Sequence, residues 1–207
     1  YASERQAALD GLAAAVEAKR DATPVAPVVA CAEIAGALDP GAIVVDESVT
    51  ASLVLRSTLR LRDPGSYYFT RGGGLGFGLP AAIGVKLARP DRPVVAVVGD
   101  GSALYTPQAL WTMAHHRVPV VAVVLNNASY LILKTGLASM AGKAAKHDVW
   151  PGMDIVDPPV DFPALAASFG VAAERVERAA DIAPAIRKGV GSGAPALVEV
   201  VVDGRMR

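Results

Sequence analysis

The sequence predicts an α/β domain in which helices cover both faces of a doubly wound, mainly parallel sheet. Two segments, 94–98 and 120–125, are apolar at every position, and a third, 197–202, is interrupted only by Glu199. Continuous apolar runs of this length are typical of strands that are buried on both faces. Helix-like segments separate these runs, and such alternation indicates a parallel sheet built from crossover units.

The first elements support this assignment and suggest a boundary near residue 27. Residues 1–20 interleave Ala and Leu with charged side chains and predict a helix, whereas 21–27 contain two prolines. We therefore divide the chain into a helical linker at 1–27, which follows an upstream domain, and a domain at 28–207. The absence of an initial Met leads us to expect that the chain is part of a longer protein. A helix is predicted over 28–38 and a short strand over 42–45.

The remaining elements continue the alternation of strands and helices. A strand-like segment at 66–69 leads into five glycines between residues 72 and 78, and Pro80 opens a predicted helix. Residues 140–160 predict a long loop because Gly, Pro and Asp gather towards their end. The other predicted elements are a helix at 80–88, a strand at 93–98, a helix at 103–116, a strand at 119–125, a helix from about residue 130, a helix at 162–169, a strand at 171–176, a helix at 180–189 and a strand at 196–202.

The composition excludes several classes of protein. The 20 basic and 20 acidic residues give no net charge, which argues against binding to nucleic acid or to an anionic membrane. No apolar run approaches the roughly 18 residues that a membrane span needs. A single cysteine, Cys31, and no recognisable signal peptide predict a cytoplasmic protein. Because 52% of the residues are hydrophobic and mean hydropathy is +0.37, we also expect an apolar face that a partner covers.

Polar residues follow two of the apolar strands directly. The run at 94–98 ends in Gly-Asp-Gly-Ser at 99–102, and the run at 120–125 ends in Asn-Asn at 126–127. Asp100 and Asn127 are 27 positions apart, the length of one helix and one strand. Since parallel strands present their carboxyl ends at one edge of a sheet, both side chains are expected there. Carboxylate and amide oxygens suit Mg²⁺ that also binds phosphate oxygens.

Glycines around Asp100 favour a bulky anion beside that metal. Gly99 and Gly101 allow the backbone to approach closely, and the helix after Ser102 directs free N–H groups towards the site. A metal-bound diphosphate satisfies both features. The chain contains neither a good dinucleotide fingerprint nor a P-loop. The glycine cluster at 72–78 is therefore predicted to be a close-approach loop that enters a helix.

Together these stretches resemble the thiamine diphosphate motif, which runs from Gly-Asp-Gly to Asn-Asn. The surrounding sequence is similar to that of benzoylformate decarboxylases, and the likeness extends from about residue 28 to the C-terminus. Acetolactate synthases share the metal motif and the glycine-rich loop. The stretches that carry the resemblance are Asp-Glu-Ser at 46–48, Asp-Pro-Gly-Ser-Tyr-Tyr-Phe at 63–69, Gly-Gly-Leu-Gly-Phe at 73–77, Leu-Pro-Ala-Ala-Ile-Gly-Val at 79–85 and Ala-Leu-Trp-Thr at 109–112.

The resemblance implies the thiamine-diphosphate-binding fold, with thiamine diphosphate and Mg²⁺ as cofactors, and a role for each matching residue. The implied metal ligands are the side chains of Asp100 and Asn127 and the backbone oxygen of Ser129. The implied cofactor contacts are Thr50, Gly101, Ser102 and Tyr130 at the diphosphate, Gly73 at the aminopyrimidine and Leu75 beneath the bent cofactor. Phe69 and Leu133 would border the substrate.

The implied function is that of a C-terminal diphosphate-binding domain in a thiamine-diphosphate-dependent carboxy-lyase that acts on a 2-keto acid. The family's activating Glu lies in an N-terminal pyrimidine-binding domain, so no catalytic residue is expected in this chain, which should be inactive alone. The implied partners are that domain, a middle domain and further copies in a dimer or tetramer. Alternatives are an acetolactate-synthase-like carboligase, a non-catalytic assembly domain that retains the cofactor site, and a Mg²⁺-dependent phosphotransferase. Thr135 and Gly136 replace aromatic residues of benzoylformate decarboxylases, which disfavours a phenyl-bearing substrate.

Overall fold

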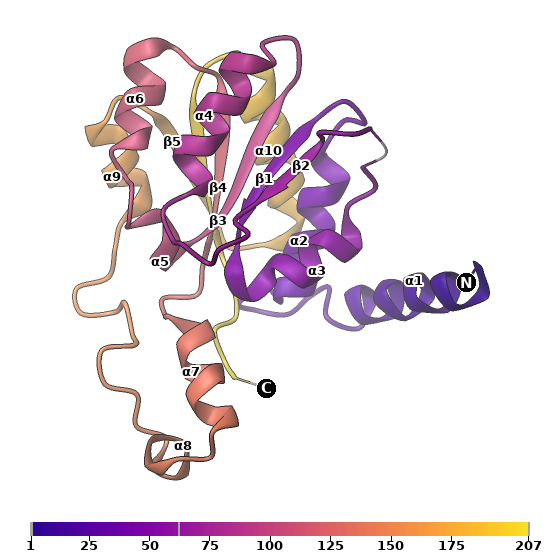
Figure 1. Cartoon of the computed structure of the whole chain (residues 1–207), viewed down its shortest axis with the longest axis vertical. Helices are drawn as coiled ribbons and strands as arrows, with labels where there is room; N and C mark the ends of the chain where they lie inside the picture. Colours follow the sequence, from indigo (N-terminus) through magenta and orange to yellow (C-terminus); the bar gives the residue numbers. More distant parts are fainter. Residues whose placement is uncertain (1, 62, 207) are drawn as a thin grey trace.

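The computed structural model describes residues 2–61 and 63–206, and in this part of the chain six parallel strands form a single sheet (Figure 1). The strand order is β2-β1-β3-β4-β6-β5. The predicted doubly wound α/β fold is confirmed, and every described strand pair is parallel. The strands are β1 Ile43–Glu47, β2 Tyr67–Phe69, β3 Val94–Gly99, β4 Val120–Asn126, β5 Ala172–Val176 and β6 Ala196–Val201.

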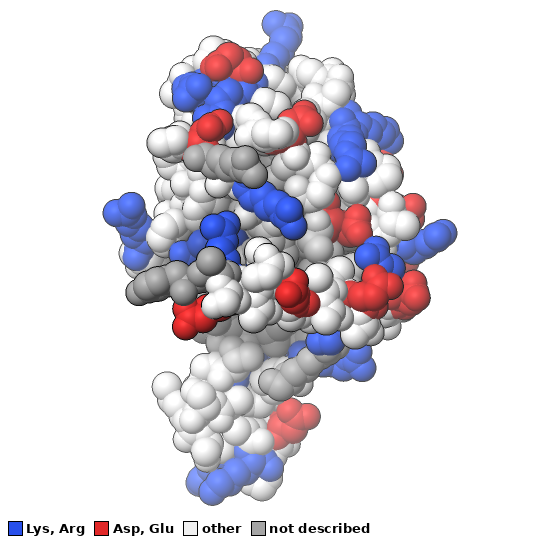
Figure 2. Space-filling view, turned by 90° about the vertical axis from the view of Figure 1, so that its right-hand side faces the viewer, with Lys and Arg blue, Asp and Glu red and all other residues white. Residues whose placement is uncertain are grey.

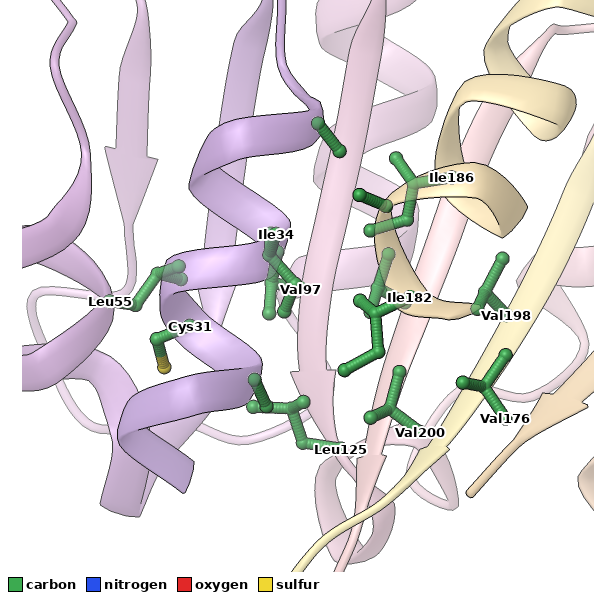
Figure 3. Packing of buried hydrophobic residues seen from close by; sticks show 14 of the residues in the cluster. Cys31, Ile34, Leu55, Val97, Leu125, Val176, Ile182, Ile186, Val198 and Val200 are labelled. Atoms are coloured by element: carbon green, nitrogen blue, oxygen red, sulfur yellow. The ribbon is translucent and has the colours of Figure 1, made fainter. Parts of the chain in front are cut away.

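Helices pack on both faces because the central strands are apolar on both faces. Figure 3 shows Cys31 and Ile34 of one helix and Ile182 and Ile186 of another near Val97 of β3, within a single buried cluster. The helices on this face are α2 (Pro27–Ala37), α3 (Ser52–Thr58) and α10 (Ala179–Gly191). A second buried cluster lies on the opposite face, where the helices are α4 (Gly78–Ala88), α6 (Ala109–His116) and α9 (Phe162–Ser168).

The order of the strands creates a crevice at the carboxyl edge of the sheet. The chain leaves β1 for the edge strand β2 and then returns to β3 on the other side of β1. Connections thus diverge from β1 and β3 in opposite directions, and ligands of doubly wound sheets bind where this happens. Glu47 ends β1, and Gly99 ends β3.

Three helices lie away from the two covered faces. Helix α1 (Ala2–Glu17) extends sideways from the domain, while α7 (Leu131–Ser139) and α8 (Lys143–His147) project beyond the carboxyl edge (Figure 1). The division of the chain at residue 27 stays a prediction. On the face shown in Figure 2, basic and acidic side chains are interspersed rather than gathered into a patch of one sign. Among the described residues, no helix combines the length and the apolarity that a membrane crossing requires.

Two sequence predictions about helices were wrong. The helix expected over 103–116 is divided into α5 (Asp100–Ala103) and α6, with turns over 104–108 between them. Pro107 lies in this stretch, and a proline has no N–H to continue a helical ladder. The loop expected over 140–160 contains α8, and neither α3 nor the short helix η1 (Val49–Ala51) before it was predicted.

Candidate functional site

A cavity opens at the carboxyl edge of the sheet. It lies among the turns that follow β1, β3 and β4 and the glycine-rich loop before α4. Eight of the eleven predicted site residues line it, namely Thr50, Leu75, Asp100, Gly101, Ser102, Asn127, Ser129 and Tyr130. The structure therefore brings together residues that the sequence separates by up to 80 positions.

Asp100 lines this cavity and is 3% exposed. Its Oδ1 accepts the N–H of Gly101 at 2.8 Å, and its Oδ2 accepts those of Asn127 at 3.1 Å and Ser129 at 3.3 Å. Burial raises the pKa of the Asp100 carboxyl above its ordinary value, and these N–H groups offset part of the rise. A bound cation would favour the ionised carboxylate that this burial disfavours.

The turn that follows β4 is fixed by its own side chains. Asn126 Oδ1 accepts the N–H of Ala128 at 2.9 Å, and Asn127 Oδ1 accepts that of Ser129 at 3.0 Å. Ala128 has a φ of 55°, the left-handed conformation that Asn and Asp side chains commonly support in turns. The two consecutive side-chain turns place Asn127 and Ser129 against Asp100.

Gly101 is required by the close packing of Tyr130. A Cβ at position 101 would lie 2.6 Å and 2.8 Å from two ring carbons of Tyr130, closer than real Cβ atoms approach. The N–H of Gly101, expected to face a diphosphate, donates to Oδ1 of Asp100 in this structure. The glycine thus lets the Tyr130 ring form a wall of the cavity.

Thr50 reaches the cavity from a turn that Asp46 anchors. Asp46 is 1% exposed, and its Oδ1 accepts the N–H and the hydroxyl of Ser48 while its Oδ2 accepts the hydroxyl of Tyr67 at 2.5 Å. Burial and this bond raise the pKa of Tyr67. The network supports Val49 at a φ of 51°, a strained position for a β-branched residue. Sequence reasoning noticed Asp46 only as part of a family stretch.

Glu47 holds the glycine-rich loop that carries Leu75. The Glu47 side chain is buried, and its two oxygens accept the N–H groups of Gly76 at 2.6 Å and Gly78 at 2.5 Å. Thr106 donates its hydroxyl to the carbonyl oxygen of Gly76 from the other side. Sequence reasoning missed this role, because the position of Glu47 in the sequence gives no signal for partners 29 and 31 positions away.

Three predicted residues do not line the cavity. Gly73 lies in the exposed part of the glycine-rich loop with a φ of 68°. Phe69, at the end of β2, has the guanidinium of Arg56 5.3 Å from its ring centre. Leu133 is 53% exposed on α7. The aminopyrimidine and substrate roles of these residues stay predictions.

The segment before α9 is fastened to the turn that follows β4. Met153 accepts the N–H of Tyr130 and the hydroxyl of Ser129 on its carbonyl oxygen, both at 2.9 Å. Lys134 of α7 forms an ion pair with Asp154. Residues 153–154 therefore lie beside Ser129 and hold it in place.

The donor set of the cavity fits a metal that also binds a phosphate. Among the described residues, Asp100 is the one carboxylate that lines it, and the other predicted ligands, from Asn127 and Ser129, are neutral oxygens. In the part of the chain that the structure describes, no group of three His, Cys, Asp or Glu residues could hold a metal. One carboxylate with neutral oxygens suits a hard cation such as Mg²⁺ that completes its shell with phosphate and water.

Fold and cavity define an α/β domain with a cavity at the carboxyl edge of a parallel sheet. The sequence pattern described as thiamine pyrophosphate enzyme, C-terminal TPP binding domain, matches residues 49–200. The chain belongs to this family of thiamine pyrophosphate enzymes. The resemblance drawn from its residues is thereby confirmed.

Individual relatives agree with this assignment. A benzoylformate decarboxylase of Pseudomonas aeruginosa is 40% identical over 169 residues, which cover 81% of this chain and 31% of the relative. A putative acetolactate synthase large subunit of Mycobacterium tuberculosis is 38% identical over 176 residues, which cover 84% of this chain and 34% of the relative. The chain spans about a third of the length of these curated relatives.

Solved structures of the same family share the fold. A thiamine diphosphate-dependent 4-hydroxybenzoylformate decarboxylase of Rhodococcus jostii is 38% identical, with a TM-score of 0.80, and the match covers 88% of this chain and 33% of that chain. A benzoylformate decarboxylase of Polynucleobacter necessarius is 26% identical, with a TM-score of 0.81. The match covers 91% of this chain and 35% of that chain.

Proposed function

We propose that this chain supplies the Mg²⁺- and diphosphate-binding part of a thiamine-diphosphate-dependent 2-keto acid decarboxylase. The observation that carries the proposal is the cavity in which Asp100, Asn127 and Ser129 converge beside glycine backbone. The similarity to benzoylformate decarboxylases favours decarboxylation.

Seven residues of the cavity have a defined part in this proposal. Asp100, Asn127 and the backbone oxygen of Ser129 hold Mg²⁺, while Thr50, Ser102 and Tyr130 contact the diphosphate, and Leu75 supports the bent cofactor. When bound, the cofactor supplies an electron sink for the carbon that loses CO₂. The protein anchors and orients the cofactor and excludes water.

The rest of the active site is proposed to lie outside this chain. Both carboxylate oxygens of Glu47 are engaged by backbone N–H groups, so Glu47 is a structural anchor rather than the activating Glu. We place the activating Glu in an upstream pyrimidine-binding domain and expect a dimer or tetramer of the longer protein. Exposed Leu75 and Ile132 at the cavity rim are apolar surface that such neighbours would cover.

Substitution of Asp100 in the full-length parent tests the proposal. Asp100→Ala removes the one carboxylate of the cavity, and we expect it to abolish Mg²⁺-dependent binding of thiamine diphosphate. Asp91→Ala is the matched control because the Asp91 side chain is 65% exposed and pairs with Arg89 at the surface. Undiminished cofactor binding and activity in Asp100→Ala would refute the assignment.

A carboligase is the second candidate, because the putative acetolactate synthase subunit is similar over 84% of the chain. A panel of 2-keto acids, with analysis of products for released aldehyde or for condensed hydroxy-keto acid, separates the two activities. A parent that binds the cofactor and turns over no keto acid would be a non-catalytic assembly protein. Calorimetry with ATP beside thiamine diphosphate would detect a phosphotransferase.

A further inference from the structure

A glutamate occupies a fully buried position in a central strand of the sheet. Glu199 of β6 is 0% exposed and interrupts an otherwise apolar strand between Val198 and Val200. Burial of a carboxylate is costly, and an apolar residue of similar volume is often as stable or more so at such a position. A carboxylate at this position therefore needs partners that offset the cost of its burial.

The Glu199 carboxylate is directed towards the turn that follows β4. Its Oε1 accepts the Nδ2 amide of Asn126 at 2.7 Å and a guanidinium N–H of Arg175 of β5 at 3.4 Å, which also forms an ion pair with it. Its Oε2 is buried and has no hydrogen-bond partner. The contact with Asn126 joins residues that are 73 positions apart in the sequence.

This bond fixes the orientation of the Asn126 amide. Nδ2 is a donor and faces the acceptor Glu199, so Oδ1 must face the other way, where it accepts the N–H of Ala128 at 2.9 Å. That second bond holds Ala128 in its left-handed conformation. The two residues on either side of Ala128 are the predicted metal ligands Asn127 and Ser129.

We propose that Glu199 is a positioning residue for the metal site. It acts through the amide of Asn126, which shapes the turn and thereby aims the oxygens of Asn127 and Ser129 at the space beside Asp100. Among the described residues, Asn126 forms no hydrogen bond with Asp100, whereas the backbone N–H of its neighbour Asn127 does. This inference rests on the proposed function, because it assumes that Mg²⁺ binds at this turn.

A swap of the two partners tests the hydrogen bond itself. In Asn126→Asp, two carboxylates face each other, and we expect half-saturation by Mg²⁺ to require about 10- to 100-fold more metal, the usual cost of losing such a supporting contact. In the double variant Asn126→Asp with Glu199→Gln, the amide and the carboxylate exchange places. This variant has the wild-type net charge, and we expect Mg²⁺ affinity within about threefold of wild type.

The measurement is a Mg²⁺ titration of thiamine diphosphate binding to the full-length parent, followed by protein fluorescence or calorimetry without substrate. Glu199→Gln alone keeps an acceptor for Asn126 and should retain wild-type affinity. Leu197→Ala is the control for stability, because Leu197 lies on the same face of β6 and is 2% exposed. It should lower the melting temperature without changing the Mg²⁺ half-saturation.

The outcomes separate this inference from the proposed function. A wild-type parent without Mg²⁺-dependent cofactor binding would overturn both. If the wild-type parent binds the cofactor and Asn126→Asp has the same Mg²⁺ half-saturation, the role of Glu199 is overturned and the proposed function stands. The role of Glu199 would also be overturned if Asn126→Asp bound Mg²⁺ more weakly than wild type and the double variant did not recover the affinity. Weak binding in the single variant with recovery in the double variant supports the proposal.

Discussion

The carboxylate of Glu47, at the end of β1, accepts the N–H of Gly78, the first residue of α4, at 2.5 Å. The contact leaves no room for a side chain at position 78, where a Cβ would lie 2.9 Å from Glu47 Oε2 and 2.7 Å from a methyl carbon of Val98. An anion at the N-terminus of a helix is also favoured by the helix dipole. Glu47 thus ties the sheet to the loop that ends at this helix.

Glu47→Gln is expected to loosen this loop. The Gln side chain has one acceptor oxygen, so its amide nitrogen must face the N–H of either Gly76 or Gly78. Loss of a buried bond to a charged group lowers the free energy of unfolding by about 2–3 kcal/mol. Since the loop carries Leu75 into the cavity, affinity for thiamine diphosphate should fall as well. Urea denaturation and cofactor titration of the full-length parent measure the two effects.

Asp39→Asn serves as the control for this variant, since Asp39 lies in an exposed turn between α2 and β1 and makes no side-chain hydrogen bond in the described structure. Asp39→Asn should change neither the free energy of unfolding nor the affinity for thiamine diphosphate. Equal stability and equal affinity of Glu47→Gln and wild type would contradict the anchoring role.

Gly101→Ala is expected to damage the cavity by steric conflict. The added methyl group would meet the ring of Tyr130 at 2.6 Å, so the ring must move out of the wall that it forms. Overpacking of this kind costs about 1–3 kcal/mol of stability. Cofactor affinity should also fall, and thermal unfolding with and without thiamine diphosphate and Mg²⁺ measures both.

A second glycine provides the matched comparison. Gly84 lies within α4, and no atom lies within 4 Å of a Cβ built there. Gly84→Ala should therefore stabilise the protein by up to about 1 kcal/mol through helix propensity and leave the cofactor site unchanged. If both variants behaved alike, the packing of Tyr130 on Gly101 would not matter for the site.

The sheet and the central pair of the site could be predicted because both depend on short stretches of sequence. The apolar runs of β3 and β4 are so continuous that burial on both faces follows, and a parallel pairing then brings their ends together. Gly99 pairs with Leu125 in this register, so Asp100 and Asn127 follow at the same edge. Their convergence needed no knowledge of the rest of the fold.

The supporting contacts could not be predicted in this way because each joins distant residues. Glu47 reaches Gly76 across 29 positions, and Glu199 reaches Asn126 across 73. A lone buried acid carries no spacing signal for its partner. In the sequence, Glu199 is recognisable only as an interruption of an apolar strand. The helix α3 was missed because its seven residues are too few for a helical periodicity to be recognised.

Asp161→Ala is expected to weaken α9 without affecting the cofactor site. Asp161 caps this helix, and its Oδ1 accepts the N–H of Ala164 at 2.9 Å. Removal of such a cap costs about 1 kcal/mol. Chemical denaturation should detect the loss, while cofactor affinity stays at the wild-type value. A matching fall in affinity would show that α9 is coupled to the cavity.

Cys31 is expected to make stability depend on pH in the alkaline range. It is 0% exposed within the apolar cluster on α2, and burial, with a contribution from Asp46, raises the pKa of its thiol from 9.0 to about 12. A thiol with a raised pKa in the folded protein keeps its full contribution below pH 9, where both states are protonated. Between pH 9 and about 12 the unfolded chain releases the proton and the folded chain retains it.

The free energy of unfolding should therefore fall as pH rises through this window, by up to about 1.4 kcal/mol per pH unit for this one group. Lysines and tyrosines titrate in the same range, so the measurement is a difference between two proteins. Wild type and Cys31→Ala are unfolded with urea at pH 8, 9.5 and 10.5. The variant lacks the thiol and should lose less stability between pH 8 and 10.5 than wild type. Parallel pH profiles would mean that the Cys31 thiol ionises as readily in the folded chain as in the unfolded one.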